Sequence, residues 1–219
     1  MSLPTSLKGI RWRNRLIGVF PFLAKLNERR WILKYADIWR KQGWQSEPAP
    51  FFVRRAMILA EARAINAQVF VETGTLYGDT PWHFRHTFQN IHTIEVEPNL
   101  AQLARERFHK QPHIRVWEGD SASLLAEVCQ GIEKPCVIYL DGHYSHGITG
   151  MGEDECPAIS ELRNIFETLR HPFRIVIDDA RLFGTNPAYP SIKAIEDFLA
   201  KNGWSAAITV ENDAILIRP

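Results

Sequence analysis

Short apolar runs alternate with helix-like segments through most of the 219-residue chain. Five of these runs are each followed by a segment whose apolar residues have helical spacing, and the runs lie at 67–74, 91–97, 114–120, 135–142 and 173–179. A strand, a helix and a second strand make a parallel crossover, so this alternation predicts an α/β fold. The last two runs, 205–210 and 214–219, are too close together for a crossover and predict an antiparallel hairpin. We therefore expect a doubly wound, mostly parallel, seven-stranded Rossmann-like sheet.

The beginning of the chain differs from the rest in charge. Residues 1–48 hold ten Lys and Arg against three Asp and Glu, a net charge of +7, whereas the whole chain carries +1 and the remainder therefore −6. We expect residues 1–50 to form a basic, Trp-rich helical extension and residues 51–219 to form the main domain. Residues 1–45 of this extension fit three roles: a cap over the site, a homodimer contact, or contact with an anionic membrane surface. Nucleic-acid binding would use similar residues, but no other feature supports it and we expect none.

Cysteine usage and apolar run lengths indicate the compartment. The three cysteines form no CxxC pair, which favours a reducing environment. The apolar run at 16–24 has nine residues, includes a proline, and is too short to span a bilayer. We expect a cytoplasmic protein, with the membrane-surface alternative placing it on the inner membrane.

Acidic residues follow every one of the five predicted parallel strands. Ligands of such sheets bind beyond the carboxyl ends of the strands, which all lie at one edge. The sequence therefore predicts a binding site at this edge, where the acidic residues are Glu72, Glu95, Glu97, Glu118, Asp120, Asp141, Asp178 and Asp179.

The turn after the first strand, ETGTLYG at 72–78, indicates the charge of the ligand. It lacks the second glycine of the dinucleotide-binding turn, and its carboxylate would repel a pyrophosphate. A positively charged group, such as an amino acid or a sulfonium, suits it better. Two alternatives are an NAD-dependent Rossmann enzyme, which this turn opposes, and a catalytically silent cofactor-binding or scaffold protein, which the acids at every strand end oppose.

These motifs resemble those of the class I S-adenosylmethionine-dependent methyltransferases. The resemblance implies that Glu72 and Gly74 line the methionine part of the cofactor, that Glu95 takes the ribose hydroxyls, and that Asp120 lies near the adenine. The cofactor-binding residues implied in this way are Glu72, Thr73, Gly74, Gly78, Glu95, Asp120, Ser121 and Asp141.

Three aspartates at the ends of the fourth and fifth strands predict a metal site. Asp141, Asp178 and Asp179 would repel one another without a cation between them, and ligand sets made only of oxygen favour Mg²⁺. The pattern is similar to that of metal-dependent O-methyltransferases of the catechol and antibiotic-sugar types, which carry D-G-D and D-D here. This chain reads D-G-H at 141–143, so the resemblance places His143 at the position of the catalytic base.

The predicted function is therefore methyl transfer from S-adenosylmethionine to a hydroxyl of a small molecule or saccharide, such as a polysaccharide precursor or a natural product, with Mg²⁺ assisting. The loop at 181–191 presents Phe183 and Tyr189, which we expect to stack on a sugar or another flat partner. Arg181 has two possible roles, contact with an anionic substrate group or an internal salt bridge.

Overall fold

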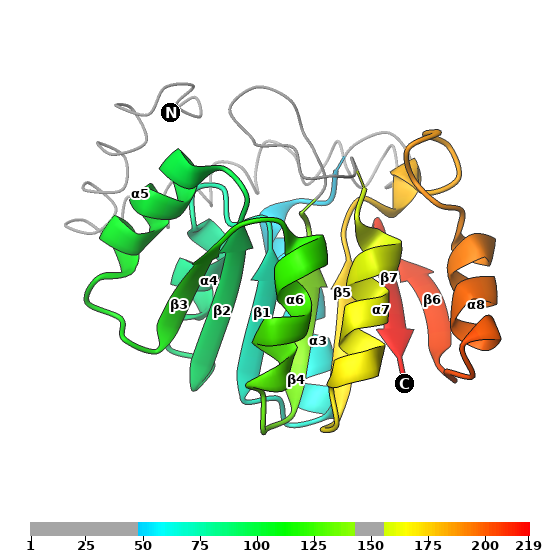
Figure 1. Ribbon diagram of the computed structural model, residues 1–219, viewed down its shortest axis with the longest axis horizontal. Helices are drawn as coiled ribbons and strands as arrows, with labels where there is room; N and C mark the ends of the chain where they lie inside the picture. Colours follow the sequence, from blue (N-terminus) through cyan, green and yellow to red (C-terminus); the bar gives the residue numbers. More distant parts are fainter. Residues whose placement is uncertain (1–47, 143–155) are drawn as a thin grey trace.

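Seven strands form one sheet in the order β3-β2-β1-β4-β5-β7-β6, in a computed structural model that describes residues 48–142 and 156–219 (Figure 1). The strands are β1 (Val69–Thr73), β2 (Asn90–Glu95), β3 (Ile114–Glu118), β4 (Cys136–Leu140), β5 (Phe173–Ile177), β6 (Ala207–Glu211) and β7 (Ala214–Arg218). The first five run parallel, and β7 is antiparallel to both β5 and β6. The predicted fold class and its reversed C-terminal strand are confirmed.

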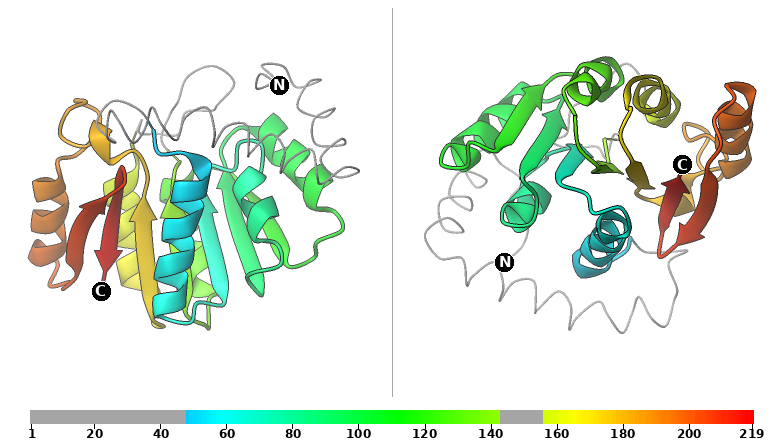
Figure 2. Two further views of the ribbon diagram at one scale, coloured as in Figure 1. Left: turned by 180° about the vertical axis from the view of Figure 1, so that it is seen from behind. Right: turned by 90° about the horizontal axis from the view of Figure 1, so that it is seen from below.

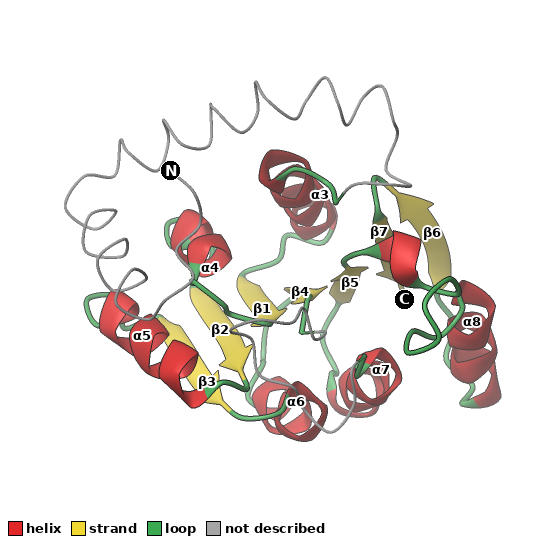
Figure 3. Ribbon diagram, turned by 90° about the horizontal axis from the view of Figure 1, so that it is seen from above, coloured by secondary structure: helices red, strands yellow, loops and turns green. Residues whose placement is uncertain are grey.

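Helices cover both faces of this sheet (Figures 2 and 3). They are α3 (Phe51–Ala64), α4 (Asp79–Phe84), α5 (Pro98–Phe108), α6 (Ser121–Gln130), α7 (Ala158–Thr168), the 3₁₀ turn η1 (Ala180–Leu182) and α8 (Ile192–Lys201). α3, α4 and α5 lie on one face, and α6, α7 and α8 lie on the other. Successive side chains of β1 point to opposite faces of the sheet. Phe70 packs in the core under α3, α4 and α5, and Val69 and Val71 pack in the core under α6, α7 and α8.

The register of the central strands brings their carboxyl ends to one level. Thr73 of β1 is paired with Ile94 of β2 and with Leu140 of β4, and Leu140 is paired with Ile177 of β5. The chain therefore leaves all four strands at the same edge of the sheet. The residues that follow these positions are Gly74, Glu95, Asp141 and Asp178.

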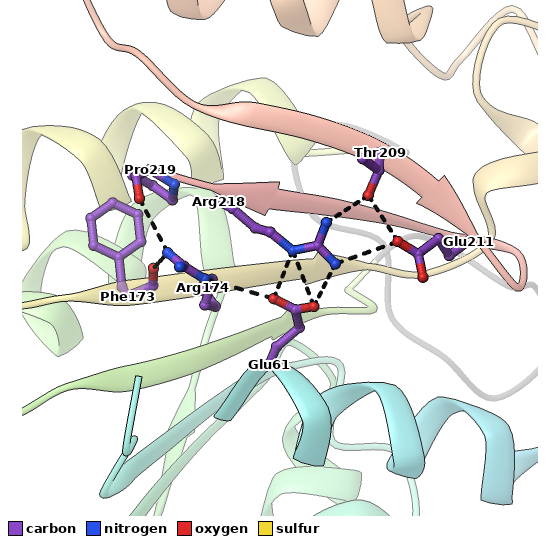
Figure 4. Close-up of polar contacts among 7 residues, drawn as sticks. All are labelled: Glu61, Phe173, Arg174, Thr209, Glu211, Arg218 and Pro219. Carbon is purple, nitrogen blue, oxygen red and sulfur yellow. Dashed lines mark hydrogen bonds and ion pairs between the residues drawn. The ribbon is translucent and has the colours of Figure 1, made fainter. Parts of the chain in front are cut away.

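Helix α3 runs opposite to β1, so its first turn lies at this same edge (Figure 2). Its other end is fixed by Glu61, which is only 7% exposed. Glu61 accepts hydrogen bonds from Nε and Nη2 of Arg218 in β7, the closest at 2.6 Å, and lies 3.7 Å from Nε of Arg174 in β5 (Figure 4). Arg54 lies two turns earlier on the same helix face, with the fully buried Ile58 between them. The Glu61 contacts therefore fix the position of α3 along the sheet, and with it the position of Arg54 at the sheet edge.

Helix α4 is short and ends at Phe84. Among residues 48–142 and 156–219, no helix has the length and apolar content needed to cross a bilayer. Residues 1–47 of the predicted extension at 1–50 lie outside the described residues.

We expect Glu61→Gln to lower the free energy of unfolding by about 2–3 kcal/mol, because it removes hydrogen bonds between charged groups at a buried position. Glu196→Gln is the matched control, since Glu196 lies 3.9 Å from the exposed Lys193 on α8 and should contribute nothing measurable. Urea denaturation followed by circular dichroism measures both. Equal stabilities for the two variants would contradict the role assigned to Glu61.

Candidate functional site

The turn between β1 and α4 packs directly on the backbone that follows β4. Gly74 and Gly78 have φ angles of +82° and +70°, which favour glycine. A Cβ atom on Gly74 would lie only 2.3 Å from the carbonyl oxygen of Asp141. The Gly74 N–H donates to the carbonyl of Ile94 at 3.0 Å. Gly74 therefore lets this turn sit against the ends of both β2 and β4, as a ligand-binding turn at the sheet edge requires.

Glu72 is a buried carboxylate at the end of β1 and is 2% exposed. Its Oε2 accepts a hydrogen bond from the Thr93 hydroxyl at 2.9 Å, and the Thr93 hydroxyl also bonds to that of Thr75. No Lys or Arg of the described residues pairs with Glu72. Burial raises the pKa of Glu72 well above its ordinary value, and the Thr93 hydrogen bond opposes this rise only in part. A cationic ligand group beside Glu72 would supply the missing counter-charge, so this residue fits the ammonium of a methionine moiety.

Glu95 holds two loops together at the end of β2. One carboxylate oxygen accepts the Leu76 N–H at 2.8 Å, and the other accepts the Glu97 N–H at 3.0 Å. Burial raises the pKa of Glu95, and these backbone hydrogen bonds oppose the rise. Each oxygen keeps a second lone pair, so the predicted contact with ribose hydroxyls remains compatible with this role. Sequence reasoning missed that Glu95 also shapes the turn after β1.

The residues predicted to lie near the adenine begin helix α6. The Asp120 side chain caps this helix by accepting the Ala122 N–H at 2.8 Å, and Ser121 is its buried first residue. Thr73 is also buried, and its hydroxyl accepts the Asp141 N–H at 3.2 Å. All the predicted cofactor-binding residues therefore lie at the carboxyl ends of β1 to β4 or in the turns that follow, with their roles toward a cofactor still predictions.

The three aspartates of the predicted metal site lie around an arginine. Nη1 of Arg54 in α3 lies 2.7 Å from Oδ2 of Asp178, and Nη2 lies 3.6 Å from Oδ1 of Asp179. The Tyr139 hydroxyl donates to Oδ2 of Asp141 at 3.3 Å. Burial raises the pKa of Asp178 and the charge of Arg54 opposes this rise. Burial alone would lower the pKa of Arg54, but the acidic groups around it raise it overall. The guanidinium is therefore charged and held within the cluster.

A second arginine completes the charge pairs at the end of β5. Arg181 lies 2.7 Å from Oδ1 of Asp179 and also contacts the fully buried Asp213. Asp179 itself has a φ angle of +57°. Of the two roles left open for Arg181, the structure shows the internal salt bridge.

The fit of a divalent cation to this cluster can be tested against these contacts. Carboxylate oxygens are suitable ligands for Mg²⁺. However, the Arg54 guanidinium lies against Asp178, and the positive end of the α3 dipole faces the same edge. Within the described part of the chain, no group of three or more His, Cys, Asp or Glu side chains is arranged to hold a metal ion. The described residues therefore do not fit a metal while Arg54 is in this position.

Two further predictions concern residues near the cluster. His143, the predicted base, lies outside the described residues, so its role stays a prediction. Phe183 and Tyr189 were expected to offer a stacking surface, which is wrong. They are 7% and 5% exposed and pack edge to face in the core with ring centroids 5.4 Å apart. Their burial is favourable because each aromatic ring removes a large apolar area from water.

Sequence reasoning missed Arg54 altogether. A helix that leads into the first strand of a parallel sheet runs antiparallel to that strand. A charged residue in its first turn therefore reaches the edge where the ligand binds. The pair Arg54-Arg55 near the start of such a helix was the signal that would have found it.

Solved structures share the fold of this chain. No family model matches the chain, and no curated protein sequence does. An O-methyltransferase from Bacillus cereus in complex with SAH superposes with a TM-score of 0.54 at 13% identity, over 87% of this chain and 91% of that one. An O-methyltransferase from Streptomyces achromogenes involved in tomaymycin synthesis, in complex with SAM, gives 0.54 at 17% identity, over 85% and 87%. The chain has the class I methyltransferase fold.

A third similar structure is the SAM-bound amino pentose methyltransferase of calicheamicin biosynthesis from Micromonospora echinaspora. Its TM-score is 0.52 at 13% identity, over 84% of this chain and 96% of that one. At these identities the likeness to methyltransferases establishes the fold, and the site residues must carry the argument for activity.

We expect the contribution of Glu72 to the free energy of unfolding to become less favourable as pH rises above about 4.3, the ordinary pKa of a glutamate. Over this range the unfolded chain releases the Glu72 proton, while the folded protein, with its raised pKa, still binds it. Stability is lost until the pH exceeds the folded-state pKa.

Glu72→Gln should remove this part of the pH dependence, whereas Glu127→Gln, at an exposed position of α6, should keep it. Urea denaturation at a series of pH values measures the slopes. Identical slopes for wild type and Glu72→Gln would show that Glu72 is not the titrating group.

Proposed function

We propose that this chain is an S-adenosylmethionine-dependent O-methyltransferase that acts on a hydroxyl of a small molecule or saccharide. The observation that carries the proposal is Glu72, a buried carboxylate without a basic partner among the described residues, beside the Gly74 turn. S-adenosylmethionine, when bound, supplies a methyl group on a positively charged sulfur, next to an ammonium group that suits Glu72. Solved structures of the same fold are named as complexes with SAM or SAH, which supports this choice of cofactor.

The sheet order weighs against the NAD-dependent alternative. The dinucleotide-binding sheet has the strand order 3-2-1-4-5-6, whereas here the antiparallel β7 lies between β5 and β6. The turn after β1 also places a carboxylate where a pyrophosphate would lie. A silent scaffold is disfavoured too, because burying Glu72 and Glu95 at the edge is costly and is better explained by a ligand that uses them.

Sugars, polysaccharide precursors and other natural products are the proposed acceptor class. Two of the similar structures come from natural-product pathways, and one of these is named as an amino pentose methyltransferase. Phe183 and Tyr189 lend this class no support, since they are buried.

The proposed chemical step needs a base on the acceptor side. The acceptor oxygen forms a C–O bond as the C–S bond breaks, and the hydroxyl proton must pass to a protein group. We propose His143 for this role, because it follows Asp141 and Gly142 in the chain and an imidazole has an ordinary pKa of about 6.5. The Mg²⁺ predicted from the sequence is not part of this step, since Arg54 lies among its proposed ligands.

The roles considered for residues 1–45, a cap, a homodimer contact or a peripheral membrane contact, stay predictions, because these residues are not described.

We expect S-adenosylmethionine to bind the protein and NAD not to bind, in paired calorimetric titrations. Glu95→Gln should weaken S-adenosylmethionine binding by about 10- to 100-fold, because a hydrogen bond to a charged group is lost. Gln is preferable to Ala here because its carbonyl can still accept one of the two backbone N–H groups that Glu95 holds.

Thermal unfolding of the same samples controls for collapse of the turn. Binding of NAD without S-adenosylmethionine would overturn the proposed function. Unchanged affinity in Glu95→Gln would overturn only the placement of the ribose.

We expect His143→Ala to lower kcat by about 10²–10⁴-fold with little change in KM, because a base acts mainly in the transition state. The measurement is the rate of SAH release with a panel of hydroxylated acceptors that includes a catechol and a hexose. His146→Ala is the matched control in the same segment and should leave the rate unchanged. A His143→Ala enzyme as fast as wild type would remove the base assignment.

A further inference from the structure

The guanidinium of Arg54 contacts Asp178 and Asp179, and it is close enough to Asp141 for the two charges to interact; these three aspartates form the aspartate cluster. We propose that Arg54 is the resident cation of this cluster and takes the place of a divalent metal. Any role of Arg54 in methyl transfer rests on the proposed function, whereas its pairing with the aspartates does not depend on that function.

Contact distances define the arrangement. Arg54 lies 2.7 Å from Asp178, which is 1% exposed, and 3.6 Å from Asp179, while its own side chain is 15% exposed. Guanidinium groups remain protonated at every accessible pH and tolerate burial better than ammonium groups. A metal added beside Arg54 would meet its positive charge at close range, in a setting where burial strengthens electrostatic repulsion. The charge of Arg54 therefore disfavours a divalent cation at this point.

Helix α3 makes this cation permanent. A bound metal can dissociate, whereas Arg54 is part of the chain. The other end of its helix is fixed by the contact between Glu61 and Arg218, and Ile58, between Arg54 and Glu61, is fully buried. The first turn of α3 contains no acidic residue, and no side chain caps it. Asp178 and Asp179 therefore also supply the negative charge that this helix N-terminus favours. Helix and cluster stabilise each other.

The guanidinium keeps hydrogen-bonding capacity for a ligand. Its Nη2 lies 3.6 Å from Asp179, beyond hydrogen-bond distance, and its Nε has no hydrogen-bond partner among the described residues. Because Nε is buried, a ligand oxygen can reach the guanidinium only through its Nη groups, on a side chain that is 15% exposed. An N–H donor at the sheet edge can bind the acceptor oxygen and hold it in place, which is the positioning task that a metal performs in other enzymes. Arginine acidifies a hydroxyl less than a metal does, so the step then depends more strongly on a separate base.

Manganese binding tests the inference without any acceptor. The full-length protein is freed of metals with EDTA, and Mn²⁺ is titrated while free Mn²⁺ is followed by electron paramagnetic resonance. Wild type and Arg55→Met, the matched control one residue along the same helix, should bind no Mn²⁺ at the cluster up to about 1 mM, the upper end of the range for weak sites. Arg54→Met leaves the three carboxylates without their cation, and should bind one Mn²⁺ per chain at least about tenfold more tightly. Asp178→Asn added to Arg54→Met should abolish the gained site.

Thermal unfolding gives an independent measurement of the same effect. Mn²⁺ should raise the Tm of Arg54→Met and leave the Tm of wild type unchanged, because a ligand stabilises only the state that binds it. Arg54→Lys keeps a positive charge and should resemble wild type, which guards against a fold defect in the Met variant. One Mn²⁺ bound per wild-type chain at micromolar concentration would overturn the inference, as would an Arg54→Met protein that folds and gains no Mn²⁺ site. Failure of the proposed function would instead appear as absent S-adenosylmethionine binding, whatever the Mn²⁺ result.

Discussion

Parallel strands deliver carboxylates to one edge of this sheet, and the balance of charge at that edge governs the arrangement of the groups around it. Each buried carboxylate costs free energy unless something compensates its charge. Asp178 is compensated by Arg54, Asp179 by Arg181, and Glu95 by two backbone N–H groups. Glu72 has only the hydroxyls of Thr93 and Thr80. The edge is therefore neutralised from within on the β5 side, whereas on the β1 side Glu72 has no cationic partner among the described residues.

This asymmetry divides the edge into two functional halves. The half near β1 and β2 is shaped by the glycine turn at Gly74 and by Glu95, and it fits a ligand with a positive charge. The half near β4 and β5 already contains its cation in Arg54. Two solved structures with the same fold are named as O-methyltransferases and one as an amino pentose methyltransferase. One fold hosts many acceptors, so the sheet alone does not identify an acceptor.

The sequence predicted the sheet, its reversed last strand and the position of the acids, because these follow from the local alternation of apolar and helical segments. It also predicted that the aspartates needed a counter-charge. It did not predict that this charge comes from Arg54, since nothing local links that residue to Asp178 more than a hundred positions later. The burial of Phe183 and Tyr189 was missed for a related reason, because a polar loop composition does not reveal which of its rings turn inward.

The contact between Glu61 and Arg218 spans 157 positions of the chain. Contacts so distant in sequence form late, because the loop between them must be ordered first. During synthesis, the segment that becomes α3 leaves the ribosome long before β7 exists. The Glu61–Arg218 contact consequently forms only after the last strand has been made, whereas α3 can already pack on β4 and β5.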